Sequence, residues 1–177
     1  TIKFIVTKGF EVISENTFVT KPLKDMIDNK ISLDGGLNKI SSTYSFDGHM
    51  KLTEDFRDKK IKRNLSLNFA FAYTHGENDI PYRDSFCNSI NTIDGGVHYD
   101  AVEEAITRYF FNETKKSMSD KEKDKLPIKW EDVLSGLNLV VNLNTDMQMQ
   151  FASQTKEKLS NEALAEPIKN IATDELT

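Results

Sequence analysis

The chain of 177 residues has little cysteine, proline and tryptophan, and it has no long hydrophobic run. Its single cysteine, Cys87, excludes an intrachain disulfide and favours a reducing compartment. No apolar stretch approaches the length of a membrane span, and no signal-peptide pattern is present. These absences argue against a disulfide-stabilised secreted domain and against a membrane protein.

An excess of basic residues is also missing. The chain carries 23 lysines and arginines against 28 acids, a formal net charge of −5. Contact with nucleic acid must therefore come from a local patch. The densest basic cluster is a candidate contact to DNA phosphates, with a solvated loop beside a strand as the alternative. It consists of Lys59, Lys60, Lys62 and Arg63.

Motifs for several common catalytic and metal sites are absent as well. The sequence has no Walker loop, no G-x-G-x-x-G, H-E-x-x-H or G-x-S-x-G motif, and no C-x-x-C pair. Nothing in it forms a complete catalytic site. The length and a hydrophobic content of 38% fit one domain with a substantial core. The chain begins at Thr1, without Met, in strand-like sequence, so we expect a piece of a longer polypeptide.

The N-terminal third predicts a hairpin, a helix and a further strand. Residues 2–7 alternate apolar and polar side chains, and residues 10–13 are typical of the returning strand. Pro22 is placed to begin a helix that runs to Ile31. Beyond it, Tyr44 and Phe46 indicate a strand, and residues 47–48 (Asp-Gly) indicate a turn.

The middle of the chain predicts two strands and a long helix. Residues 65–73 alternate strictly, and residues 84–90 are expected to pair with them as a hairpin. A helix should follow the pair Gly95 and Gly96, since the next apolar residues recur at helical spacing. Residues 112–125 carry both charge signs and predict a solvated loop or a frayed helix end.

His98 lies in the first turn of this expected helix. It could be a metal ligand, a general base or a structural hydrogen-bonding residue. No second histidine or cysteine stands at ligand spacing, so no metal site is expected and the structural hydrogen bond is favoured. Asp100, in the same turn, complements the helix dipole and needs no chemical role.

The C-terminal part places a short polar loop between a strand and a helix. Residues 137–143 indicate a buried strand, and residues 159–176 indicate a helix in which Pro167 starts a second segment. Between them lie Gln154, Thr155 and Lys156. A lysine on such a loop can reach an anion held by a neighbouring domain, because its ammonium group is a compact cation with three donors. The whole order of elements predicts an α+β two-layer sandwich, a mixed sheet with helices on one face.

Three stretches in this order resemble the transducer domain of the ATPase (B-type) subunit of type IIA DNA topoisomerases. Residues 88–100 read N-S-I-N-T-I-D-G-G-V-H-Y-D, residues 132–137 read D-V-L-S-G-L, and residues 151–159 match F-x-S-Q-T-K-x-K-L. The N-S-I start and H-x-D spacing are similar to eukaryotic and T-even-phage enzymes, and D-G-G is similar to gyrase B and topoisomerase IV. The early E-G-G of the family has only loose candidates at residues 34–36 and 46–48.

The resemblance implies a ribosomal protein S5 domain 2-like fold. Residues 1–177 would be a single transducer domain, with a GHKL ATPase domain upstream and a TOPRIM domain downstream. Gln154 and Lys156 would contact the ATP γ-phosphate, and Lys156 would have a catalytic role by neutralising transition-state charge. The structural residues of the family motif would be Asp94, Gly95, Gly96 and His98.

The same resemblance implies cofactors, partners and a compartment. ATP and Mg²⁺ would be bound mainly by the upstream domain, and the chain itself would hold no metal. The partners would be double-stranded DNA, the ATPase and DNA-cleavage parts of the enzyme, and a second copy in a homodimer, without a membrane. The compartment would be the cytoplasm, the nucleus for a eukaryotic source, or the host cytoplasm for a phage. Two alternatives remain: an S5-like DNA-binding module without ATP coupling, and the second domain of a MutL-like ATPase.

Overall fold

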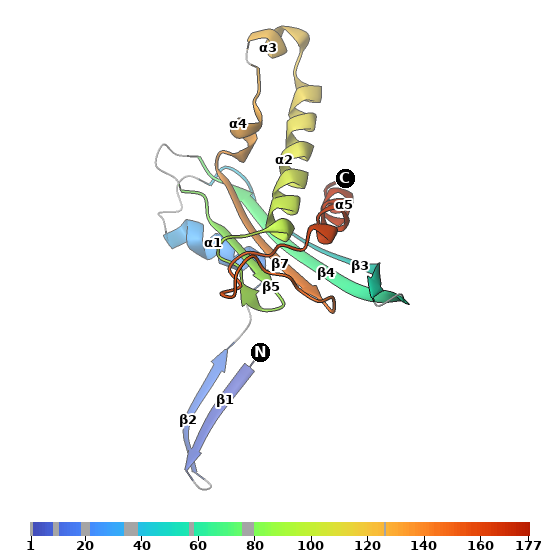
Figure 1. Cartoon of the computed structure of the whole chain (residues 1–177). Helices are drawn as coiled ribbons and strands as arrows, with labels where there is room; N and C mark the ends of the chain where they lie inside the picture. The colour runs from blue at the N-terminus through green and yellow to red at the C-terminus, as the bar shows by residue number, and fades with distance from the viewer. Residues whose placement is uncertain are drawn as a thin grey trace.

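A computed structural model gives the fold (Figure 1) and describes residues 2–8, 11–18, 22–33, 39–56, 59–75, 80–125 and 127–177. The first two strands, β1 (Ile2–Lys8) and β2 (Glu11–Phe18), pair antiparallel in a sheet of their own. This confirms the predicted N-terminal hairpin. The candidate E-G-G position at residues 34–36 lies outside the described residues.

Within the described ranges, a larger mixed sheet has the strand order β3-β4-β7-β5-β6. Strand β5 runs parallel to β7, and the other neighbouring strands are antiparallel. The prediction of a mixed sheet in an α+β fold is confirmed. Its strands are β3 (Tyr44–Phe56), β4 (Lys59–Tyr73), β5 (Arg83–Cys87), β6 (Ile90–Asn91) and β7 (Leu137–Thr145).

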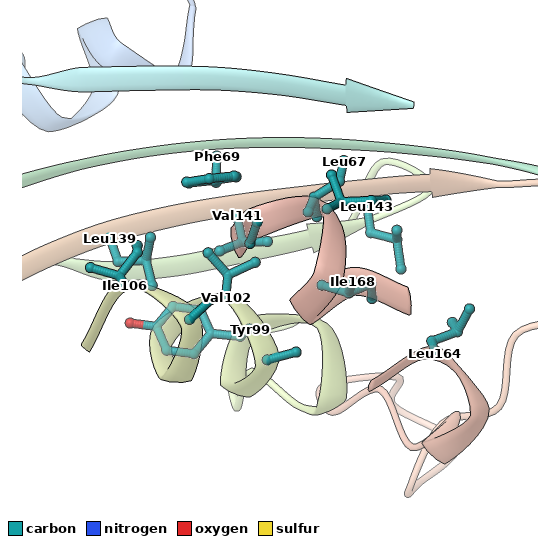
Figure 2. Close-up of a cluster of buried hydrophobic side chains, with 14 of the residues drawn as sticks. Leu67, Phe69, Tyr99, Val102, Ile106, Leu139, Val141, Leu143, Leu164 and Ile168 are labelled. Carbon is teal, nitrogen blue, oxygen red and sulfur yellow. The ribbon is translucent and has the colours of Figure 1, made fainter. Parts of the chain in front are cut away.

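The main core lies between this sheet and two helices, α2 (Val97–Ser117) and α5 (Ala165–Leu176). Figure 2 shows side chains of β4 and β7 facing those of the helices across one buried layer. The short 3₁₀ helix η1 (Glu162–Leu164) precedes α5 and adds Leu164 to this layer. Pro167 is the third residue of α5, so the prediction that it starts a helical segment is wrong by two positions.

Helix α1 (Leu23–Leu33) lies on the opposite face of the sheet, which corrects the prediction that helices cover one face only. Its Ile27 is fully buried and packs with Ala70 and Val140. Residues paired across β4 and β7 point to the same face of the sheet, and successive residues of a strand point to opposite faces. The side chains of the Ala70–Val140 pair therefore lie on the face opposite to those of the Phe69–Val141 pair. The strict alternation of residues 65–73 predicted one apolar face, which carries the larger side chains, and gave no signal of the shallow alanine surface on the other face.

The turn predicted at residues 47–48 is wrong, because both residues lie inside β3. Gly48 pairs with Leu67 of β4. A Cβ at Gly48 would overlap the side chain of Ile171 on α5, so the glycine allows this helix to approach the sheet closely.

The predicted hairpin between residues 65–73 and 84–90 is also wrong, since β7 lies between β4 and β5. Asn138 of β7 connects the two neighbours. Its buried amide group donates to Thr74 Oγ1 at 3.0 Å and accepts from the Tyr82 backbone N–H at 2.8 Å. This one side chain therefore fixes the end of β4 and the approach to β5.

Residues 112–125, which were predicted as a solvated loop or a frayed helix end, are more helical than predicted. Helix α2 continues to Ser117, and α3 (Asp120–Lys125) and α4 (Trp130–Leu134) follow. Figure 1 shows α3 and the outer half of α2 extending away from the sheet. No helix within the described ranges is long and apolar enough to cross a membrane.

Candidate functional site

The structure brings the D-G-G turn and the Q-T-K loop into direct backbone contact. The Asp94 N–H donates to Glu157 O at 2.9 Å, and the Val97 N–H donates to Leu159 O at 3.1 Å. In return, the Leu159 N–H donates to Gly95 O at 3.2 Å. The start of α2 and the loop after β7 therefore form one hydrogen-bonded unit.

Gly96 is the residue that permits this contact. Its φ is 114° and its ψ is −171°, a combination that residues with a Cβ hardly adopt. A Cβ at this position would overlap the backbone oxygen of Leu159. Gly96 therefore permits the close backbone approach between the turn and the loop.

The Q-T-K loop is closed at its base by backbone hydrogen bonds. The Ala152 N–H donates to Lys158 O at 2.9 Å, and the Ser160 N–H donates to Gln150 O at 2.9 Å. At the tip, the Lys156 N–H donates to Ser153 O at 3.2 Å. These bonds hold a polar tip on a short, defined stem.

The side chains of Gln154 and Lys156 are exposed at this tip. In the described part of the chain, neither side chain has a hydrogen bond or an ion pair; the Lys156 ammonium lies 5.9 Å from the centre of the Phe151 ring. The neighbouring Glu157 carboxylate instead accepts a hydrogen bond from Thr155 Oγ1 at 2.8 Å. The loop thus presents a cation and an amide whose donors are available to an external anion.

Lys156 also has an unusual backbone conformation, with φ of 61°. A side chain in this left-handed region costs about 1–2 kcal/mol relative to the right-handed region. Such a residue persists where the surrounding structure fixes it, and here the hydrogen bonds of the stem do so.

His98 lies in the first turn of α2 and contacts a buried hydroxyl group. It is fully buried, and its Nε2 lies 3.2 Å from Thr92 Oγ1, which in turn lies 2.6 Å from Ser85 Oγ. Burial lowers the pKa of His98 to about 4, so the imidazole is neutral at physiological pH. Over the described ranges, no group of three or more potential ligands is arranged to hold a metal ion.

The sequence of the chain has relatives among known proteins. Residues 17–177 match the family model for DNA gyrase B. The chain belongs to the DNA gyrase B family. This confirms the resemblance to the B-type subunits of type IIA topoisomerases that the three motifs indicated.

Two curated relatives show how far the similarity extends along the sequence. The chain is 31% identical over 168 residues to the DNA gyrase B protein of Thermotoga maritima, covering 83% of this chain and 26% of the relative. It is 27% identical over 183 residues to the B-type subunit of DNA topoisomerase 4 of Bacillus subtilis, covering 96% of this chain and 27% of the relative. The chain thus spans about a quarter of the length of these relatives.

Solved structures support the fold. The 43K ATPase domain of Thermus thermophilus gyrase B, in complex with an aminocoumarin, matches with a TM-score of 0.64 at 22% identity. The alignment covers 92% of this chain and 39% of that structure. The topoisomerase IV ATP-binding domain of Francisella tularensis matches with a TM-score of 0.58 at 22% identity, over 91% of this chain and 39% of that one.

The basic cluster of this gyrase B family member lies elsewhere, on β4 rather than in a loop. Strand β4 pairs with β7 only from Leu65 onward, so the cluster lies beyond the end of β7. Lys59, Lys60 and Lys62 are exposed, whereas Arg63 is half-buried and pairs with Glu54 at 2.7 Å. The four residues are therefore not equivalent candidates for a DNA contact.

Two features of the site were missed at the sequence level. The buried hydroxyl pair of Ser85 and Thr92 supports His98, and a polar pocket lies beside the D-G-G turn. Neither has a motif, because each is assembled from β5, the turn and α2. In the sequence, the signal for the hydroxyl pair is only that Ser85 and Thr92 flank a short hairpin that precedes His98.

Proposed function

We propose that this chain is the transducer part of an ATP-dependent type IIA DNA topoisomerase. It would couple ATP binding and hydrolysis in an adjacent GHKL ATPase domain to movement of a protein gate and passage of a DNA duplex. The observation that carries this proposal is the Q-T-K tip, where Gln154 and Lys156 are exposed without side-chain hydrogen bonds or ion pairs in the described part of the chain. A tip of this chemistry fits the γ-phosphate of a nucleotide held by a neighbouring domain.

Gln154 and Lys156 would share the phosphate contact. Lys156 would supply a positive charge and up to three donors, and it would offset the negative charge of the transferred phosphoryl group. The Gln154 amide would orient the same group through a hydrogen bond. ATP, when bound with Mg²⁺ mainly by the ATPase domain, supplies the phosphoryl group and the free energy of its hydrolysis.

The stem of the loop supports a coupling role. Because the loop is hydrogen-bonded to the turn before α2, a displacement of the tip would act on the helix and on the sheet beneath it. A contact that exists in only one nucleotide state would favour one position of this domain over another. The transducer would in this way pass the nucleotide state on to the rest of the enzyme.

The remaining partners follow from the same proposal. Residues 1–177 would be one transducer domain between an ATPase domain and a TOPRIM domain, in an enzyme that acts as a homodimer on double-stranded DNA. The exposed Lys59, Lys60 and Lys62 would contact DNA phosphates. We propose that the enzyme is cytoplasmic. It would be nuclear for a eukaryotic source and would lie in the host cytoplasm for a phage source.

The test is DNA-stimulated ATP hydrolysis by the whole protein that contains this chain. Lys156→Ala should lower the rate on the order of 100-fold, the loss seen when a donor to transition-state charge is removed. Lys121→Ala, at an exposed lysine of α3, is the matched control and should leave the rate unchanged. A folded Lys156→Ala protein that hydrolyses ATP like the unmodified one would contradict the proposal and favour a DNA-binding module without ATP coupling.

A further inference from the structure

The side chains at the tip of the Q-T-K loop alternate in how they are used. Ser153, Thr155 and Glu157 contact one another: the two hydroxyl oxygens lie 2.7 Å apart, and Thr155 Oγ1 lies 2.8 Å from Glu157 Oε2. The intervening Gln154 and Lys156 have no side-chain hydrogen bond or ion pair within the described ranges. The tip therefore combines side chains that bind each other with side chains that remain available.

The direction of the two hydrogen bonds follows from the chemistry of the groups. A carboxylate only accepts hydrogen bonds, so the Thr155 hydroxyl donates its proton to Glu157. Thr155 Oγ1 then offers only lone pairs to Ser153, so Ser153 Oγ is the donor of the other bond. The three side chains form a short hydrogen-bonded chain that ends on the Glu157 carboxylate.

Glu157 is placed in sequence to be an ion-pair partner of Lys156. The Cα atoms of consecutive residues are about 3.8 Å apart, and both side chains are long. An exposed pair of this kind favours the contact by roughly two- to fivefold in an equilibrium. No such pair forms among the described residues, because the carboxylate is hydrogen-bonded to Thr155 instead. The backbone of Glu157 is fixed as well, since its carbonyl oxygen accepts from the Asp94 N–H at 2.9 Å.

The second lysine of the loop, Lys158, has a carboxylate nearby. Burial raises the pKa of Asp100 in α2, and the positive charge of Lys158 opposes this effect. The charge of Lys158 is thus partly offset by Asp100. Of these two lysines, Lys156 is therefore the one whose charge is available to an anion from outside the loop.

We propose that Thr155 is a positioning residue, whose hydroxyl holds the Glu157 carboxylate apart from Lys156 and so keeps the ammonium group available to the γ-phosphate. Ser153 supports this arrangement by donating to the Thr155 hydroxyl. An anion can then bind Lys156 without first displacing a carboxylate. Only the identity of the anion, the γ-phosphate of ATP, rests on the proposed function.

The first test is the rate at which Lys156 is acylated in the whole protein that contains this chain, without nucleotide. In Thr155→Val this rate should fall about two- to fivefold, because an ammonium group paired with a carboxylate releases its proton less readily. Thr155→Ser keeps the hydroxyl and should react like the unmodified protein. Adding Glu157→Gln to Thr155→Val should restore the rate, and exposed Lys121 is the control that should react equally in all variants.

The second test is DNA-stimulated ATP hydrolysis by the same variants. Thr155→Val should lower kcat/KM about two- to fivefold, because the γ-phosphate must then displace Glu157 from Lys156. Glu157→Gln should restore kcat/KM in the Thr155→Val background, which it could not do if the first substitution had only damaged the loop. Thr173→Val, at an exposed threonine of α5, is the matched control and should leave kcat/KM unchanged.

The outcomes separate this proposal from the proposed function. If Thr155→Val leaves the acylation rate of Lys156 unchanged, or if Glu157→Gln does not restore it, the proposal is wrong whatever Lys156→Ala does to ATP hydrolysis. If acylation changes as expected while Lys156→Ala hydrolyses ATP normally, Thr155 still positions the two charges and the γ-phosphate contact is removed. Thr155 is exposed and its hydroxyl contacts only side chains of the tip, so the variants are expected to stay folded.

Discussion

Replacing Gly96 by alanine should damage the joint between α2 and the Q-T-K loop. The φ of 114° and ψ of −171° cost a residue with a Cβ about 1–3 kcal/mol. The new methyl group would also push against Leu159 O and weaken two backbone hydrogen bonds, each worth about 1 kcal/mol. We therefore expect Gly96→Ala to lower the free energy of unfolding by about 3–5 kcal/mol.

Gly95→Ala is the matched control in the same turn. Its φ is also positive, at 67°, but a Cβ there would meet only the Tyr99 side chain, at an ordinary distance of 3.5 Å. The expected loss is about 1–2 kcal/mol, from the left-handed backbone alone. Urea denaturation measures the free energy of unfolding of both variants. An unchanged slope of this free energy against urea concentration would show that the substitution leaves the compactness of the folded and unfolded states unchanged. Equal losses in the two variants would refute the argument that the Leu159 contact requires Gly96.

Three further predictions concern pH, the sheet and DNA. The pKa of His98 is about 4 in the folded state and 6.5 in the unfolded state, so the unfolded state binds more protons between these pH values. The free energy of unfolding should therefore fall by roughly 3 kcal/mol as the pH falls from 6.5 to about 4. In calorimetry, His98→Gln should remove this part of the pH dependence. In chemical denaturation, Asn138→Ala should lower the free energy of unfolding by about 2–4 kcal/mol, because it leaves its hydrogen-bond partners at Thr74 and Tyr82 unpaired. The control Asn144→Ala, at an exposed position of β7, should lower it by under about 0.5 kcal/mol. Replacing Lys60 and Lys62 together by alanine should weaken DNA binding and lower the slope of log affinity against log salt by about 2; an unchanged slope would exclude them as phosphate contacts.

Local patterns predicted the elements well, because strands and helices depend on neighbouring residues. The alternation in β4 and the apolar stripe of α2 are examples, and both elements occur where expected. The pairing of β5 was mispredicted because its partner is β7, which lies far away in the sequence. Residues 47–48 were mispredicted because Gly48 serves a helix contact rather than a turn.

The site was predictable in its parts but not in its assembly. The motif resemblance identified the Q-T-K loop and the D-G-G turn, and the structure adds that Gly96 and Leu159 join them. The polar pocket beside the D-G-G turn could not be predicted, since Arg83, Tyr99 and Glu103 come together only through the pairing of β5 with β7 and the placement of α2. Contacts between distant segments leave no periodic signal in a single sequence.

The central claim is that Lys156 contacts the γ-phosphate of ATP, and protection of its amine from acylation tests this most directly. The whole protein would be treated with an acylating reagent in the presence of AMP-PNP, ADP or no nucleotide, and the labelling rate of each lysine read by mass spectrometry. AMP-PNP should slow the labelling of Lys156 strongly and ADP should not, while exposed Lys121 reacts at the same rate in all three. Equal labelling of Lys156 with AMP-PNP and with ADP would contradict the account.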